Sequence, residues 1–93
     1  MKHLNIKIYG RVQGVFFRDS AKERANKSGI YGFVRNEPDG TVYIEAEGEE
    51  ENLKKFLDWC HQGPLMALVE KVELEAGDNK NFRDFIIENN SHA

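Results

Sequence analysis

The sequence has one cysteine, two prolines and no long apolar run, and each shortage excludes a class of protein. Cys60 alone cannot close an internal disulfide, and no CxxC or Cys/His cluster suggests a metal site. A secretory signal or membrane span needs a continuous apolar stretch, whereas Leu4, Ile6 and Ile8 alternate with polar residues. We therefore expect a cytoplasmic protein with a buried thiol, no cofactor, no metal and no membrane partner.

An excess of basic charge is also missing. The 93 residues contain 13 Lys and Arg against 16 Asp and Glu, a formal net charge of -3. That balance argues against a nucleic-acid partner, which favours a basic face. A small anion is not excluded, because Arg11, Arg18 and Lys22 lie close together in the sequence. The length predicts a single domain, 1–93, and nothing in it demands more than a monomer.

Periodic apolar residues predict the element order β-α-β-β-α-β with a short additional strand. Strands are expected at 2–9, 30–36, 41–47, 68–76 and 82–87. One helix is expected to start between residues 17 and 19 and to end at 28, and a second to cover 49–62. Pro38 and Gly40 mark a turn between the second and third strands. This order predicts an α+β, ferredoxin-like sandwich, with two helices packed on one face of an antiparallel four- to five-stranded sheet. The polar tail 89–93 is expected to fray.

The segment Gly10–Arg18, GRVQGVFFR, connects the first expected strand to the first expected helix. Gly10 and Gly14 permit backbone angles that point successive N–H groups into one concavity, and a helix N-terminus adds further donors. We expect a pocket the size of one phosphate. The segment is neither GxxxxGK[ST] nor GxGxxG, and two glycines before a helix are equally typical of an ordinary connecting loop.

Two polar side chains near this loop each have a structural and a functional interpretation. Arg18 faces the positive end of the helix dipole, which is unfavourable unless an anion binds there, but it can also lie over Phe16 or Phe17 as a surface residue. Asn36 is typical of a turn, although its carboxamide can also orient a water molecule. The histidines are expected to be exposed; they are His3, His61 and His92.

GRVQGVFFR, followed by GFVRN at Gly32–Asn36 and PDGTV at Pro38–Val42, resembles the acylphosphatase family over essentially the whole chain. The resemblance implies a ferredoxin-like fold and metal-free hydrolysis of carboxyl–phosphate anhydrides. It implies that Arg18 binds the substrate phosphate and that Asn36 positions the attacking water. It also implies a backbone N–H cradle made by Gln13, Gly14, Val15, Phe16, Phe17 and Arg18. Glu37 departs from the family pattern and would place a carboxylate near the anion.

The scarcity of acids, bases and nucleophiles near the loop agrees with that chemistry. An acyl phosphate expels a carboxylate whose conjugate acid has a pKa of about 4, so the leaving group departs without a proton or a metal. Phosphoryl transfer is largely dissociative, and the protein then has only to position the reactants and stabilise charge. The expected partners are therefore a small acyl phosphate and phosphate or another inorganic anion.

Two other functions remain open at this point. The same loop could serve a non-catalytic phosphate-binding or anion-binding module, although the chain ends soon after its last strand, which favours a free-standing enzyme. The element order is also that of RNA-recognition motifs, and Tyr31, Phe33 and Tyr43 could share an exposed sheet face. The acidic charge and the lack of an RNP1-like segment predict no RNA binding.

Overall fold

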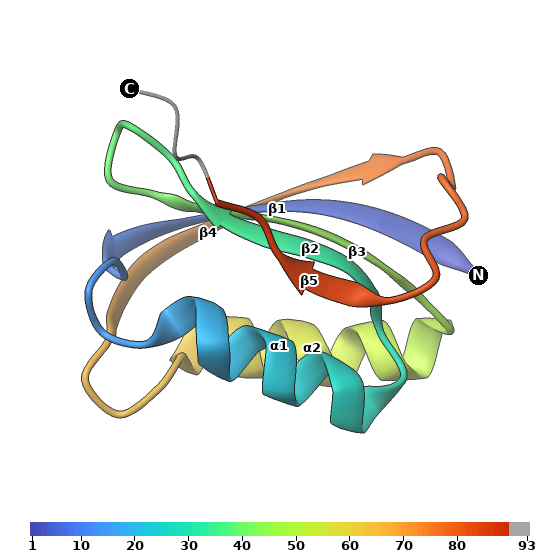
Figure 1. Ribbon diagram of the computed structural model, residues 1–93, viewed down its shortest axis with the longest axis horizontal. Coiled ribbons are helices and arrows are strands. Elements are labelled where there is room, and N and C mark those ends of the chain that lie inside the picture. Colours follow the sequence, from blue (N-terminus) through green and yellow to red (C-terminus); the bar gives the residue numbers. More distant parts are fainter. Residues whose placement is uncertain (90–93) are drawn as a thin grey trace.

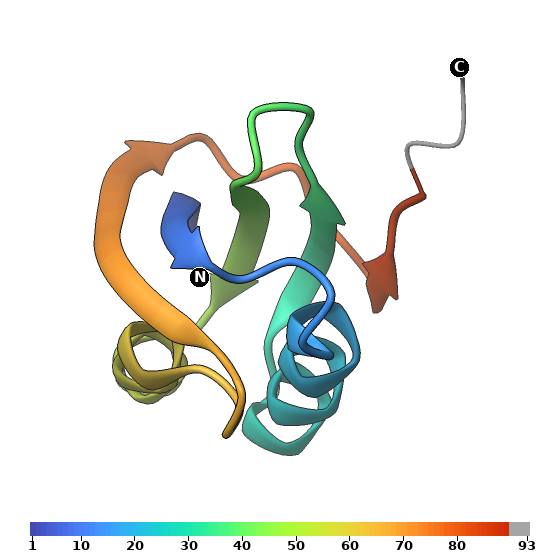
Figure 2. The ribbon, with the colours of Figure 1, turned by 90° about the vertical axis from the view of Figure 1, so that its left-hand side faces the viewer.

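A computed structural model describes residues 1–89, so the expected frayed tail lies outside the described residues except for Asn89. Both helices lie on one face of a five-stranded sheet with the strand order β4-β1-β3-β2-β5 (Figures 1 and 2). The strands are β1 (Lys2–Arg11), β2 (Tyr31–Asn36), β3 (Val42–Gly48), β4 (Leu68–Gly77) and β5 (Phe85–Ile87), and the helices are α1 (Phe17–Ser28) and α2 (Glu50–Gln62). The expected α+β ferredoxin-like fold is confirmed.

The sheet is mixed rather than wholly antiparallel. β1 pairs antiparallel with β3 and β4, and β2 pairs antiparallel with β3. β5, in contrast, pairs parallel with β2, with Gly32 opposite Phe85 and Val34 opposite Ile87. Because these two strands run parallel, their C-terminal ends lie next to each other at the same end of the sheet.

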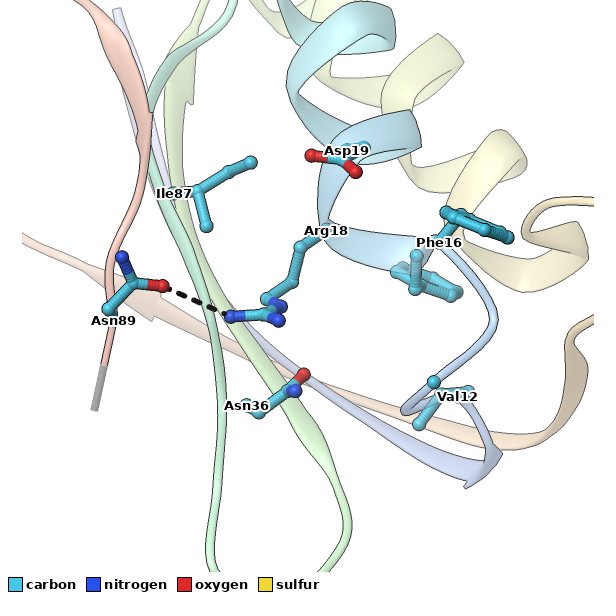
Figure 3. Close-up of a pocket in the computed structure, with 9 residues that line it drawn as sticks. Val12, Phe16, Arg18, Asp19, Asn36, Ile87 and Asn89 are labelled. Atoms are coloured by element: carbon cyan, nitrogen blue, oxygen red, sulfur yellow. Dashed lines mark hydrogen bonds between the residues drawn. The ribbon is translucent and has the colours of Figure 1, made fainter. Parts of the chain in front are cut away.

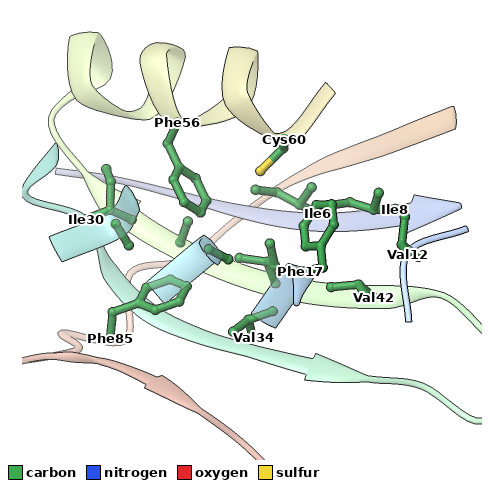
Figure 4. Close-up of a cluster of buried hydrophobic side chains, with 14 of the residues drawn as sticks. Ile6, Ile8, Val12, Phe17, Ile30, Val34, Val42, Phe56, Cys60 and Phe85 are labelled. Carbon is green, nitrogen blue, oxygen red and sulfur yellow. The ribbon is translucent and has the colours of Figure 1, made fainter. Parts of the chain in front are cut away.

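The core lies between the sheet and the two helices (Figure 4). Alternation along β1 turns Ile6 and Ile8 inward, where both are fully buried. The helical spacing of Leu53, Phe56 and Cys60 gives α2 one buried stripe. Cys60 is buried in this core, as expected, and its burial raises the pKa of the thiol. Within the described part of the chain, no helix is long and apolar enough to span a membrane.

Gly10 ends the regular pairing between β1 and β4. The register of the two strands shifts between Tyr9 and Gly10, and Gly10 has a φ of 126°. A Cβ atom at this position would lie 2.1 Å from the carbonyl oxygen of Leu68. Only glycine allows both this backbone angle and this approach, and the chain leaves the sheet after the next residue, Arg11.

His3 is buried, contrary to the expectation that all three histidines are exposed. Its Nδ1 lies 2.7 Å from Oε2 of Glu47, and its Nε2 lies 3.2 Å from Oε1 of Glu45. The connection between β4 and β5 folds over this group, because Glu47 accepts hydrogen bonds from the backbone N–H groups of Lys80 and Phe82. The Phe82 ring also stacks on the imidazole at a centroid distance of 5.9 Å.

The two carboxylates beside His3 predict acid-sensitive stability. Burial alone would raise the pKa of Glu47, but hydrogen bonds from the Lys80 amide and the His3 ring outweigh it and hold the pKa below its ordinary value of 4.5. The pKa of Glu45 is lowered in the same direction. In acid the unfolded chain therefore binds more protons than the folded protein. The stability that these carboxylates contribute is complete above their ordinary pKa and is lost as the pH falls through the lower pKa of the folded state.

We expect Glu47→Gln to lower the free energy of unfolding at neutral pH by about 1–3 kcal/mol and to flatten its decrease between about pH 5 and pH 3. Urea unfolding at several pH values measures both effects. The exposed Glu75→Gln is the matched control and should leave the curve unchanged. Parallel curves for wild type and Glu47→Gln would contradict the assignment.

Candidate active site

A pocket of about 510 Å³ opens where the start of α1 faces the ends of β2 and β5 (Figure 3). Its lining residues come from the loop after β1, the first turn of α1, and these two strand ends. They are Val12, Gly14, Phe16, Phe17, Arg18, Asp19, Asn36, Ile87 and Asn89. A water molecule occupies about 30 Å³ in the liquid, so a phosphoryl group needs on the order of 100 Å³. The pocket is thus wider than the phosphate-sized site expected from the sequence.

The loop from Val12 to Phe16 is held by its buried valines, Val12 and Val15. Gly14 and Phe16 both have left-handed backbone angles, with φ values of 75° and 65°. A Cβ at Gly14 would meet nothing within 4 Å, so bare backbone lines the pocket here. Phe16 is not a glycine, and its left-handed conformation costs about 1–2 kcal/mol.

The backbone amides of residues 13–18 belong to the loop after β1 and to the first turn of α1. Within residues 1–89, no backbone carbonyl in a turn or loop accepts a hydrogen bond from any of them. The first amides of α1 also lack partners inside the helix, because an α-helix leaves its first four N–H groups without an intrahelical acceptor. Left-handed turns that precede a helix form concavities suited to anions.

Phe17 and Arg18 point in different directions from the first turn of α1. Phe17 is only 1% exposed, and the centroid of its ring lies 5.2 Å from the centroid of the Trp59 ring. Arg18 is half-buried and extends its guanidinium towards Asn36 and Asn89 (Figure 3). Its Nη1 donates to Oδ1 of Asn89 at 3.4 Å, a long contact that uses one of five N–H donors. Arg18 therefore lines the pocket, and its role in binding an anion stays a prediction.

Asn36 and Asn89 reach the pocket together because β2 and β5 run parallel. Val34 is opposite Ile87, and two residues further along the chain lie Asn36, at the end of β2, and Asn89, just beyond β5. The sequence pointed to Asn36 but gave no indication of Asn89 and Ile87. Asn89 and Ile87 reach the pocket because the three-residue strand β5 pairs parallel with β2. No local sequence pattern predicts that pairing.

Two residues of the expected cradle, Gln13 and Val15, do not line the pocket. The Val15 side chain is in the core. The Gln13 side chain instead crosses to the β2–β3 turn, where Nε2 donates to the carbonyl oxygens of Glu37 at 2.8 Å and Thr41 at 2.9 Å. Gln13 therefore ties the loop to the backbone directly after Asn36.

The Glu37 carboxylate, which was expected near the anion, does not line the pocket. Its Oε2 accepts from Nε of Arg35 at 2.7 Å, and the same guanidinium donates to Glu88 at 2.8 Å. Arg35 also lies over the rings of Phe33 and Tyr43, at 5.4 and 4.9 Å from their centroids. A cation on these aromatics covers the surface on which RNA bases would stack.

Among residues 1–89, Asp19 is the only carboxylate that lines the pocket, and it is exposed on α1. Arg18 therefore supplies the positive side-chain charge that faces the loop amides. Among the described residues, 1–89, no group of three His, Cys, Asp or Glu side chains is placed to hold a metal ion.

Comparison with known proteins gives one consistent result. A family model described as Acylphosphatase matches residues 4–87. The chain is 51% identical over 74 residues to an acylphosphatase of Rubrobacter xylanophilus, covering 80% of this chain and 67% of that protein. It is 44% identical over 82 residues to one from a Nocardioides species, covering 88% and 83%. A crystal structure of acylphosphatase from Bacillus subtilis matches with a TM-score of 0.92 and 32% identity, covering 95% of this chain and 99% of that one.

The bridge from Gln13 to the β2–β3 turn predicts a measurable loss of stability. Gln13→Leu removes both hydrogen bonds, and we expect the free energy of unfolding to fall by about 1–3 kcal/mol because two partly buried carbonyls lose their donor. Urea unfolding measures this loss. Gln62→Leu, at the exposed end of α2, is the matched control and should change stability by less than about 0.5 kcal/mol. Equal effects of the two substitutions would show that the bridge contributes nothing.

Proposed function

Since this chain belongs to the acylphosphatase family, we propose that its pocket hydrolyses an acyl phosphate with Arg18, Asn36 and the backbone of residues 13–18. Family membership makes the protein a hydrolase of acyl phosphates. The roles of the individual residues are our proposal. Its main support is that one pocket is lined by Arg18 from α1, Asn36 from the end of β2 and the glycine-containing loop between β1 and α1.

The first step is binding of the phosphoryl group. Its oxygens accept hydrogen bonds from the amides of residues 13–18, and the positive end of the α1 dipole favours their charge. Arg18 adds a planar fork that can hold two of these oxygens at once. A bound anion also removes the unfavourable placement of Arg18 at the positive end of the helix. The loop and Arg18 thus stabilise the charge that the three equatorial oxygens carry in the transition state.

The second step is attack by a water molecule held by Asn36. The carboxamide offers both a donor and an acceptor, so it can fix the orientation of the water without changing its own charge. The water oxygen bonds to phosphorus while the bond from phosphorus to the acyl oxygen breaks, and its electron pair leaves on the carboxylate. One proton of the water stays on the product phosphate and the other passes to solvent. Nucleophile and leaving group are in line through phosphorus.

Arg18→Lys tests the two-pronged grip because it keeps the charge and removes the fork. We expect kcat/KM for benzoyl phosphate to fall about ten- to a hundredfold, the equivalent of one or two charge-assisted hydrogen bonds, and inhibition by inorganic phosphate to weaken. Phosphate release measures the first effect and competition with phosphate the second. Arg24→Lys, on the exposed surface of α1, is the matched control. Equal inhibition by phosphate in wild type and Arg18→Lys would refute the grip.

Asn36→Ala separates positioning of the water from binding of the phosphate. We expect kcat to fall at least about a hundredfold, with the inhibition constant of inorganic phosphate nearly unchanged. The exposed Asn26→Ala on α1 is the control, and circular dichroism with urea unfolding checks that each variant folds. Undiminished turnover in a folded Asn36→Ala protein would exclude the water-positioning role. If the wild type binds phosphate but releases none from benzoyl phosphate, the pocket is a non-catalytic anion-binding module.

A further inference from the structure

Phe16 has two unfavourable features that no contact in the fold explains. Its side chain is 70% exposed, and its backbone is left-handed, with φ 65° and ψ 24°. Within residues 1–89 its ring has no aromatic or cationic partner among the ring contacts. Phe17, its neighbour, is buried and supplies the anchor for α1. The Phe16 ring is thus dispensable for the core, although it forms one wall of the pocket.

We propose that Phe16 is a specificity-determining residue that binds the acyl group and favours aromatic acyl phosphates, an inference that rests on the proposed function. The pocket is about 510 Å³, several times the space on the order of 100 Å³ that a phosphoryl group needs. The remaining space accommodates the group attached to that phosphate. Its walls include the apolar side chains of Val12, Phe16 and Ile87.

In-line displacement places the acyl group on the Phe16 side. A water held by Asn36 approaches phosphorus from the end of β2, so the leaving carboxylate departs on the opposite side. Figure 3 shows Asn36 and Phe16 at separate parts of the pocket, with Arg18 extending from α1 towards Asn36 and Asn89. A planar ring on the acyl carbon can then stack against or meet the edge of the Phe16 ring, an arrangement that aromatic pairs favour.

Other exposed apolar side chains of this region lie outside the pocket lining. Leu68 is 63% exposed and is paired with Arg11, the last residue of β1 before the loop. Leu65 is fully exposed in the connection between α2 and β4. That connection passes close to α1, since a Cβ at Gly63 would lie 2.9 Å from the Phe17 ring. Leu65 does not line the pocket, and it provides a matched apolar control.

The test compares benzoyl phosphate with acetyl phosphate. Phe16→Asn removes the ring with little added backbone strain, because asparagine tolerates left-handed angles. We expect the ratio of kcat/KM for benzoyl phosphate to that for acetyl phosphate to fall roughly two- to tenfold, mainly through KM for benzoyl phosphate. Phe16→Tyr should restore the wild-type ratio, and Leu65→Ser should leave it unchanged. An unchanged ratio in Phe16→Asn, or an equal fall in Leu65→Ser, overturns the inference.

Inhibition of the wild type gives a second measurement that needs no variant to fold. Phenylphosphonate and methylphosphonate carry similar charge but differ in the ring. We expect phenylphosphonate to inhibit roughly two- to tenfold more strongly, and equal inhibition would overturn the role of Phe16. Hydrolysis of neither acyl phosphate by the wild type would instead reject the proposed function itself. The two failures are therefore distinguishable.

Discussion

The burial of the Phe17 ring determines how the start of α1 meets the sheet. The ring packs on Trp59 and against the backbone of Gly63, so the first helical turn can take only one rotation about its axis. With this residue directed into the core, the preceding Phe16 must project outwards and the following Arg18 must face the ends of β2 and β5. This apolar contact thus sets the directions of Phe16 and Arg18, while the hydrogen bonds of Gln13 tie the loop to the β2–β3 turn.

A second constraint keeps the carboxylates of Glu37 and Glu88 away from the pocket. The chain carries an excess of acid, and Glu37 and Glu88 both lie within two residues of the asparagines that line the pocket. Arg35 binds both carboxylates on the other face of the sheet and also covers two aromatic rings. Strand alternation explains the separation, since neighbouring residues of a strand point to opposite faces. A phosphoryl group in the pocket would therefore meet Arg18 and the loop amides without meeting the carboxylates of Glu37 and Glu88.

Local periodicity explains most of what could be predicted from the sequence. The apolar stripe of α2 located that helix to within one residue, and Pro38 with Gly40 located the β2–β3 turn. Long-range contacts could not be predicted in this way. His3 meets Glu47 across 44 residues, and the parallel direction of β5 depends on the path of the connection that covers them. For the site, the sequence motif identified Arg18 and Asn36, but which of two consecutive phenylalanines is buried depends on the packing of α2.

β4 is an edge strand of the sheet, because β1 is its only neighbouring strand, and it is longer than β5, the strand at the other edge. Nearly all of its residues are exposed, and four of them are charged: Glu70, Lys71, Glu73 and Glu75. The unpaired peptide groups of an edge strand can form hydrogen bonds with the edge strand of another copy. Two copies paired along β4 would bring several carboxylates together, and their repulsion opposes this pairing. The acidic surplus that argues against a nucleic-acid partner thus also opposes edge-to-edge self-association into aggregates.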